Sequence, residues 1–172
     1  MAEVTPSQDF LTQPDGKPVV PGGLNVLTIL TFIGSGLGFL GVCWNFFNAK
    51  KGIEAMENMI NSPQFDSMPA FAKKFYTPEA LELARKAYEN RIPITLIGLI
   101  GIGLCVYGAI QMRKRKMQGY YMYVIGELIP FVVNTILLGV GFITGMSGLI
   151  GVAFAILFVL LYTMQRKHLT EK

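Results

Sequence analysis

The hydrophobic residues of this chain are gathered into four long runs, which cover about 24–48, 92–112, 119–143 and 147–165. A helix needs ~20 apolar residues to cross a bilayer, and each run is close to that length or exceeds it. None of the runs has the polar position every three or four residues that is typical of a soluble core helix. The pattern therefore predicts an all-α membrane protein, whose four transmembrane helices form an antiparallel bundle within residues 24–172.

The connection 49–91 is too long to be a structureless loop in a compact protein. Its first half has apolar residues at helical spacing, namely Ile53, Met56 and Ile60. Its second half contains Thr77-Pro78-Glu79, which offers an N-cap, a proline at the first helical position and an acid after it. We therefore expect two short amphipathic helices that cap the outer ends of the spans. A docking surface for a partner protein is the alternative interpretation of this region.

Residues 1–23 precede the first hydrophobic run and differ from it in composition. They are polar, net acidic and contain four prolines. Such a stretch buries too little apolar surface to fold by itself. The sequence predicts a flexible N-terminal arm here.

The chain has 15 Lys and Arg against 11 Asp and Glu, which gives a net charge of +4. Two basic clusters lie at the ends of hydrophobic runs: Arg113, Lys114, Arg115 and Lys116, and then Arg166 and Lys167. Cations in such places set the topology of membrane proteins and contact lipid head groups. We expect both termini on the cytoplasmic side and the connection 49–91 outside. No nucleic-acid-binding motif accompanies the positive charge, so a nucleic-acid partner is not expected.

Glu127 is the one acid within the hydrophobic runs. A charge at the depth we expect for it costs at least ~2.5 kcal/mol, so the side chain should face the bundle, and burial should favour its neutral form. Pro130 cannot donate a backbone hydrogen bond to Gly126, so we expect a kink beside the glutamate. Asn134 shares this helical face and is expected to meet the glycine-rich middles of the first two spans.

Depth counting along the other spans suggests neighbours for this carboxyl group. Thr31 in the first span and Tyr107 in the second fall at a similar level to Glu127, which predicts a layer of these three residues. Cys43 and Cys105 fall at different depths, so we expect free thiols that fill space.

Small residues along the spans indicate where helices can approach one another closely. The glycines selected for this role are Gly34, Gly38, Gly101, Gly141 and Gly145. The third and fourth runs are separated only by residues 144–146, which predicts a tight antiparallel hairpin.

The residues argue against an enzyme. No cluster of His, Cys, Asp and Glu has metal-ligand spacing, no catalytic Ser/His/Asp set can be assembled, and no phosphate-binding loop is present, so no cofactor is expected. A single intramembrane glutamate can join neighbouring helices by a hydrogen bond, and it can also serve a proton- or cation-coupled carrier. We favour the first interpretation and expect an accessory or scaffold subunit, or a homo-oligomeric assembly. A small proton- or ion-coupled transporter or channel using Glu127 is the alternative.

Several stretches together resemble small four-span membrane proteins found in some Gram-negative bacteria. They read GLNVLTILTFIGSGLGF, MPAFAKKF, LELARKAYENRIPI and YGAIQMRKRKMQGYYMYVIGELIP, and they cover most of the chain after the first twenty residues. The resemblance implies an inner-membrane location and assigns no activity or site residue.

Overall fold

The computed structural model describes residues 20–169, so nearly all of the predicted N-terminal arm lies outside the described residues. Four long helices make up most of the described chain: α1 (Gly22–Ile60), α4 (Arg91–Arg113), α5 (Met117–Leu138) and α7 (Met146–Gln165). Short helices lie between or after them: η2 (Pro63–Phe65), α2 (Ala70–Lys73), α3 (Pro78–Glu89), α6 (Gly141–Thr144) and η3 (Arg166–His168). The all-α prediction is confirmed.

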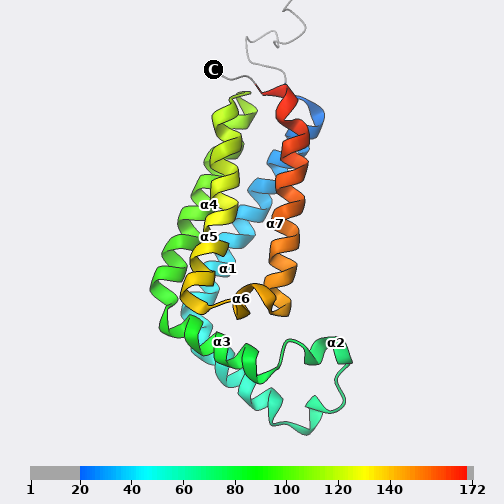
Figure 1. The fold of residues 1–172 in the computed structure, drawn as a ribbon, viewed down its shortest axis with the longest axis vertical. Helices are drawn as coiled ribbons and strands as arrows, with labels where there is room; N and C mark the ends of the chain where they lie inside the picture. The colour runs from blue at the N-terminus through cyan, green and yellow to red at the C-terminus, as the bar shows by residue number, and fades with distance from the viewer. Residues whose placement is uncertain (1–19, 170–172) are drawn as a thin grey trace, which may run out of the picture.

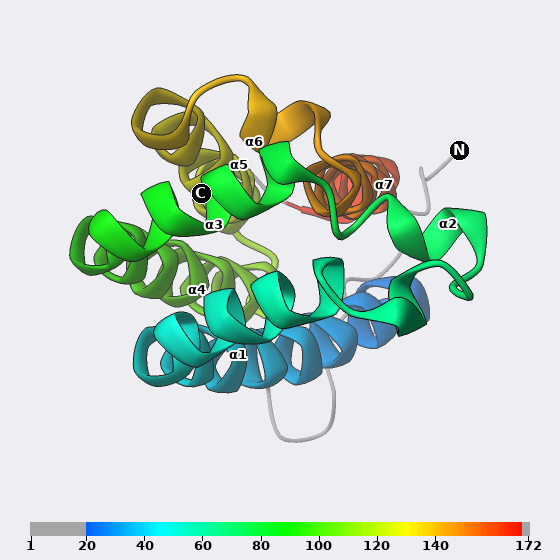
Figure 2. The ribbon, with the colours of Figure 1, turned by 90° about the horizontal axis from the view of Figure 1, so that it is seen from below.

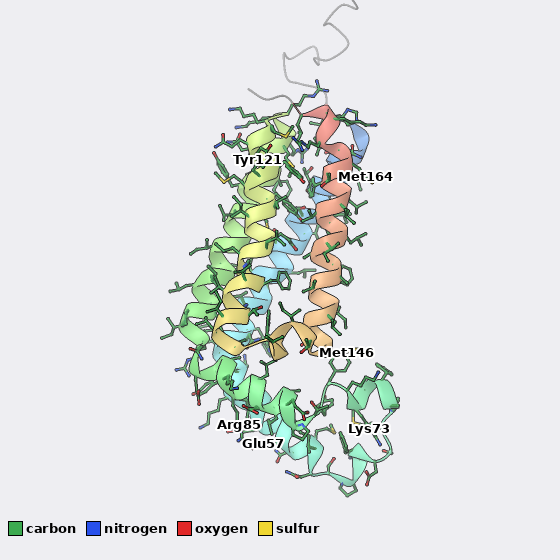
Figure 3. The ribbon with its side chains drawn as sticks, in the orientation of Figure 1. Glu57, Lys73, Arg85, Tyr121, Met146 and Met164 are labelled. Carbon is green, nitrogen blue, oxygen red and sulfur yellow. The ribbon has the colours of Figure 1, made fainter. Side chains whose placement is uncertain are left out.

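The four long helices lie side by side, and each runs antiparallel to the one before it (Figure 1). All four are long and apolar enough to cross a membrane, and within their apolar stretches only 17–22% of the residues are buried. Most apolar side chains therefore point outward, as Tyr121 of α5 and Met164 of α7 do in Figure 3. A bundle with such a surface is a multi-pass membrane protein in contact with lipid.

Helix α1 is longer than predicted. Its 39 residues span ~58 Å, whereas the hydrocarbon core of a bilayer is ~30 Å thick. The stripe Ile53, Met56 and Ile60, predicted to form a separate amphipathic helix, continues the first span without a break. No proline interrupts this stretch, and Gly52 alone does not end a helix. The helix stops at Ile60, shortly before Pro63.

Helix α3 begins as the sequence predicts. The Thr77 hydroxyl accepts a hydrogen bond from the backbone N–H of Ala80 at 3.1 Å. Arg85 forms an ion pair with Glu57, which ties α3 to the extended part of α1 (Figure 3). On the exposed side, a hydrogen bond from Lys86 at 2.8 Å lowers the pKa of Glu82. Seen from below, α3 crosses the end of the bundle (Figure 2).

Among the long helices, α4 and α5 are in close contact through two pairs of glycines. A Cβ atom placed on Gly108 would lie 2.6 Å from the carbonyl oxygen of Gly119, and the reciprocal distance is also 2.6 Å. Gly101 and Gly126 show the same relation at 2.8 Å in both directions. The backbones are therefore in direct contact, an arrangement that permits Cα–H···O interactions between membrane helices.

The basic residues between these helices form a tight turn. The N–H of Arg115 bonds to the carbonyl of Met112 at 2.9 Å, and that of Lys116 bonds to the carbonyl of Gln111 at 3.1 Å. These two bonds define a Schellman motif, in which Arg115 takes the left-handed position with φ 61°. The turn brings the first residues of α5 directly opposite the last residues of α4.

The prediction of a tight hairpin between the third and fourth spans is wrong. Helix α5 ends at Leu138, and Gly139 follows with φ 87°, a conformation that glycine adopts without strain and that stops the helix. Residues 139–145, including α6, then connect α5 to α7. Gly141 and Gly145 therefore lie in this connection rather than at a contact between spans. A Cβ atom on Gly141 would meet nothing within 4 Å, and one on Gly145 would meet only the carbonyl of Gly141.

The buried core lies toward the end of the bundle that carries the basic turn. It contains Leu24 and Leu27 of α1, Met112 of α4, Tyr123 of α5 and Tyr162 of α7. Leu169, just after η3, joins the same cluster. The glutamate of α5 lies where this packed region gives way to the more open half of the bundle.

We predict that Gly108→Ala destabilises the protein whereas Gly103→Ala does not. The first change forces a methyl group against the backbone of α5, and such overpacking costs about 1–3 kcal/mol. At Gly103 a Cβ atom would meet nothing within 4 Å, and alanine favours a helix by up to ~1 kcal/mol. Thermal unfolding in detergent, followed by circular dichroism, measures the difference. Equal stability of the two variants would contradict the glycine contact.

Candidate functional site

Polar side chains from all four long helices meet at one level of the bundle. We call the following five residues the polar cluster: Thr31 of α1, Cys105 of α4, Tyr123 and Glu127 of α5, and Tyr162 of α7. Two of them, Thr31 and Glu127, belong to the layer predicted from depth counting.

The upper part of the polar cluster is tightly packed. Thr31 and Tyr162 share a buried hydrogen bond of 2.7 Å, and Tyr162 is fully buried. The rings of Tyr123 and Tyr162 lie 4.4 Å apart between centroids, a separation typical of packed aromatic pairs. Tyr123 also interacts with Thr31. These contacts join α1, α5 and α7 at one point.

Glu127 is half-buried and lies beside Cys105, whose Sγ atom is 3.5 Å from Oε2 of the carboxyl group. Tyr123, one turn earlier on the same helix, interacts with the same carboxyl. A thiol is a weak hydrogen-bond donor. Within residues 20–169, therefore, no strong donor from another helix holds this carboxyl group.

The predicted place of Tyr107 in this layer is wrong. Its hydroxyl accepts a hydrogen bond from Gln111 of the same helix at 2.6 Å, and 45% of the residue is exposed. Tyr107 is two residues from Cys105, which puts it roughly 200° around the helix from the residue that faces Glu127. Depth counting predicted the correct level along α4, but Tyr107 lies on the face of α4 that points away from Glu127.

Cys105, Tyr123 and Tyr162 are the members of the polar cluster that depth counting along the sequence did not assign. The signal for Cys105 was present, because it lies between Gly101 and Gly108 on the small face of α4 that contacts α5. Tyr162 lies in the last apolar run, and no spacing rule relates it to Thr31. Both cysteines are free, as predicted.

An open cavity of about 400 Å³ lies between the four long helices next to the polar cluster, and some of its lining residues are exposed. Its polar lining consists of Thr31, Ser35, Cys105, Tyr123 and Glu127. The rest of its wall is apolar and includes phenylalanine side chains from α5 and α7. The cavity thus resembles a small-molecule site, in which a few polar groups converge in a mostly apolar space.

The glycine pair predicted on α1 borders this cavity. A Cβ atom on Gly34 would meet nothing within 4 Å, and one on Gly38 would touch only the side chain of Ile102 at 3.6 Å. Both residues line the cavity. Gly34 therefore leaves open space on the inner side of α1, where a close helix contact was expected. Gly101 is the predicted packing glycine that does lie at a close backbone contact.

Pro130 lies one turn beyond Glu127 and packs on α4. Its Cγ atom is 2.7 Å from the position that a Cβ atom on Gly101 would occupy. The carbonyl of Gly126, which cannot receive a hydrogen bond from Pro130, also faces Gly101. Proline, its freed carbonyl and the glutamate are thus close together at the wall of the cavity.

Asn134 does not meet the glycine-rich middles of the other spans. The two glycine pairs set the register of α4 and α5 and place Asn134 level with the first turn of α4 near Pro93. It is not among the residues that line the cavity. Its side-chain oxygen is buried without a hydrogen-bond partner in the described part of the chain. Asn134 is seven residues beyond Glu127, and this distance places it near the end of the bundle opposite the basic turn.

The two basic clusters lie at one end of the bundle, with the turn between α4 and α5 beside the end of α7 (Figure 1). The guanidinium of Arg166 lies 6.0 Å from the ring centroid of Tyr120, which links the tail cluster to the first turn of α5. This arrangement agrees with a common position at one membrane surface.

We predict that Tyr162→Phe destabilises the protein more than Tyr120→Phe. Both tyrosines bond to a threonine of another helix, Tyr162 to Thr31 in the core and Tyr120 to Thr163 at an exposed position. Hydrogen bonds between membrane helices contribute on average ~0.6 kcal/mol and up to ~1.7 kcal/mol, and the buried one should lie in the upper part of that range. Thermal unfolding of both variants in detergent tests this. A larger loss for Tyr120→Phe would contradict it.

The chain matches no known family model, no curated protein and no solved structure. The resemblance to small four-span membrane proteins is thus supported as far as the four candidate spans, and no family is assigned.

Proposed function

We propose that this protein is a small membrane carrier, in which Glu127 exchanges a proton for a cationic ligand bound in the central cavity. The observation that carries the proposal is the position of this carboxyl group at the wall of a 400 Å³ cavity inside a membrane bundle. An ionisable group in the membrane is costly, so its presence in a cavity favours a role in binding or transport.

A purely structural role for Glu127 has less support. A glutamate that joins two helices should bond a strong partner on the other helix, and the thiol of Cys105 at 3.5 Å is a weak one. Helices α4 and α5 are already in backbone contact at Gly101 and Gly126, directly beside it. Their association therefore does not require the carboxyl group.

The uneven packing of the bundle agrees with access from one side at a time. The core around Leu24, Met112 and Tyr162 closes the end that carries the basic turn. The cavity lies on the other side of the polar cluster, where Gly34 of α1 leaves open space between the helices. A carrier alternates between such one-sided states around a fixed site.

We place the protein in the inner membrane of a Gram-negative bacterium with both termini in the cytoplasm. The support is the position of the two basic clusters at one end of the bundle, since positive charge in short flanks favours the cytoplasmic side. The extended part of α1 and helix α3 then lie outside, and the cavity is on the outer side of the packed core.

We predict that proteoliposomes with an acidic interior release protons when a cation (Na⁺, K⁺ or tetraethylammonium, each tested alone) is added outside, and that Glu127→Gln removes this flux. Glutamine keeps the size and hydrogen bonding of the side chain but cannot take up or release a proton. A pH-sensitive dye inside the vesicles gives the rate, which should fall to that of empty vesicles.

The control for this experiment is Tyr107→Phe, which changes a polar group on the neighbouring helix α4 that does not line the cavity. It should leave the flux unchanged. Circular dichroism and reconstitution yield show that Glu127→Gln is folded and inserted. A wild-type rate equal to that of empty vesicles, or a Gln variant as active as the wild type, would contradict the carrier.

A second candidate function is that of an accessory subunit or a self-assembling protein. The observation that favours it is the segment after α1, where η2 and α2 extend sideways from the bundle (Figure 1). Phe71 of α2 is 65% exposed there, and Lys73 and Lys74 add positive charge. An exposed aromatic residue on such a segment is typical of an interface anchor.

We expect Phe71→Asp to release any stoichiometric partner, or to shift a homo-oligomer to a smaller state, without loss of fold. Phe71 is exposed, so the substitution costs the monomer little stability. Native mass spectrometry of the protein purified in nanodiscs measures the bound mass. Lys51→Asp is the control, because it introduces the same residue at an exposed position of α1 outside this segment and should leave the bound mass unchanged. A complex that survives Phe71→Asp, or a wild-type monomer, would contradict this function.

A further inference from the structure

We propose that the ligand of the cavity is a lipophilic organic cation with a single positive charge, which enters from the bilayer. This inference rests on the carrier site proposed above and specifies the class of molecule that the site takes. It follows from the charge, the size and the lining of the cavity, and from where its wall reaches the lipid-facing surface.

The charge of the ligand follows from the one acid in the cavity wall. Glu127 lines the cavity together with the hydroxyl groups of Thr31, Ser35 and Tyr123, and among residues 20–169 no Lys, Arg or His belongs to the lining. A bound group with one positive charge can neutralise the carboxylate inside the low-dielectric interior. An anion would meet no positive partner there.

An inorganic cation fits the site poorly. Ca²⁺ requires six to eight oxygen ligands, and dehydrated K⁺ requires a ring of carbonyl oxygens. The cavity offers one carboxylate and three hydroxyl groups. Within residues 20–169, no three His, Cys, Asp or Glu side chains lie close enough together to hold a metal ion. A bare ion would also leave most of the 400 Å³ empty.

The size and the aromatic lining fit an organic cation. Sites for small molecules usually have volumes of about 300–1,000 Å³, and this cavity lies within that range. Tyr123, Phe131 and Phe158 contribute aromatic side chains to its wall. Aromatic rings attract organic cations, and most strongly where water is excluded. The missing side chain of Gly34 provides space for the apolar part of the ligand.

The cavity reaches the lipid-facing surface on one side. Leu30 of α1 and Phe154 of α7 both line it, and they are also 44% and 59% exposed. These two residues mark where the wall of the cavity meets the bilayer. A molecule that is already dissolved in the lipid can therefore enter without crossing the packed core.

The experiment compares tetraphenylphosphonium with tetraphenylborate, which have nearly the same shape and opposite charge. Equilibrium dialysis of each labelled ion against the protein in dodecylmaltoside measures binding. We expect the wild type to bind the phosphonium in preference to the borate, and Glu127→Gln to weaken phosphonium binding at least tenfold.

A matched pair of glycine variants tests the location of the site. Gly34→Leu adds a side chain to the wall of the cavity and should also weaken phosphonium binding at least tenfold. Gly103→Leu makes the same change at an exposed position outside the cavity and should leave binding unchanged. Circular dichroism shows whether each variant is folded. If Gly34→Leu does not fold, Ser35→Leu replaces it, since Ser35 also lines the cavity.

Equal binding of the two ions, or phosphonium binding that survives Glu127→Gln, would overturn the proposed ligand class. The result is separable from the carrier proposal. Phosphonium binding at Glu127 without proton flux upholds the ligand class and contradicts the carrier. Proton flux that depends on Glu127 but is not accompanied by phosphonium binding contradicts the ligand class alone.

Discussion

The backbone contact between α4 and α5 is the constraint on which the rest of the bundle depends. Because Gly101 and Gly108 face Gly126 and Gly119 without intervening side chains, the two helices have one separation and one register. The Schellman turn at Arg115 starts α5 in that register, although a residue other than glycine occupies the left-handed position. Lipid cannot drive helices together as water does, so this close packing supplies much of the specificity of the fold.

The same contact determines the surroundings of Glu127. It places Cys105, a small residue on the glycine face of α4, against the carboxyl group, and it directs the larger Tyr107 outward. On the opposite side of α5 the packing is less close, because Gly34 of α1 faces open space and Gly38 meets only the side chain of Ile102. Glycine therefore serves two purposes here. Between α4 and α5 it brings backbones together, and on α1 it leaves the cavity open.

The local sequence predicted those features whose causes are local. The four apolar runs predicted the four candidate spans, and Thr77 with Pro78 predicted the start of α3. The end of α5 was missed because Gly139 is one of several glycines in an apolar run, and only its φ of 87° distinguishes it as a helix stop. The length of α1 was missed because the polar residues after Asn48 suggested a boundary, whereas a helix can leave the membrane without a break.

By itself the sequence determined that the chain is an all-α, four-span membrane protein with one intramembrane acid, because hydrophobic length and the cost of a charge in lipid depend only on residue type. It also gave the depth of Glu127 and Thr31, because the rise of a helix per residue is constant. Only the tertiary structure decided which face of each helix turns inward. The inward face depends on which glycines contact the backbone of a neighbouring helix. As a result, Cys105 rather than Tyr107 lies beside Glu127, Tyr162 bonds to Thr31, and a cavity lies next to the carboxyl group.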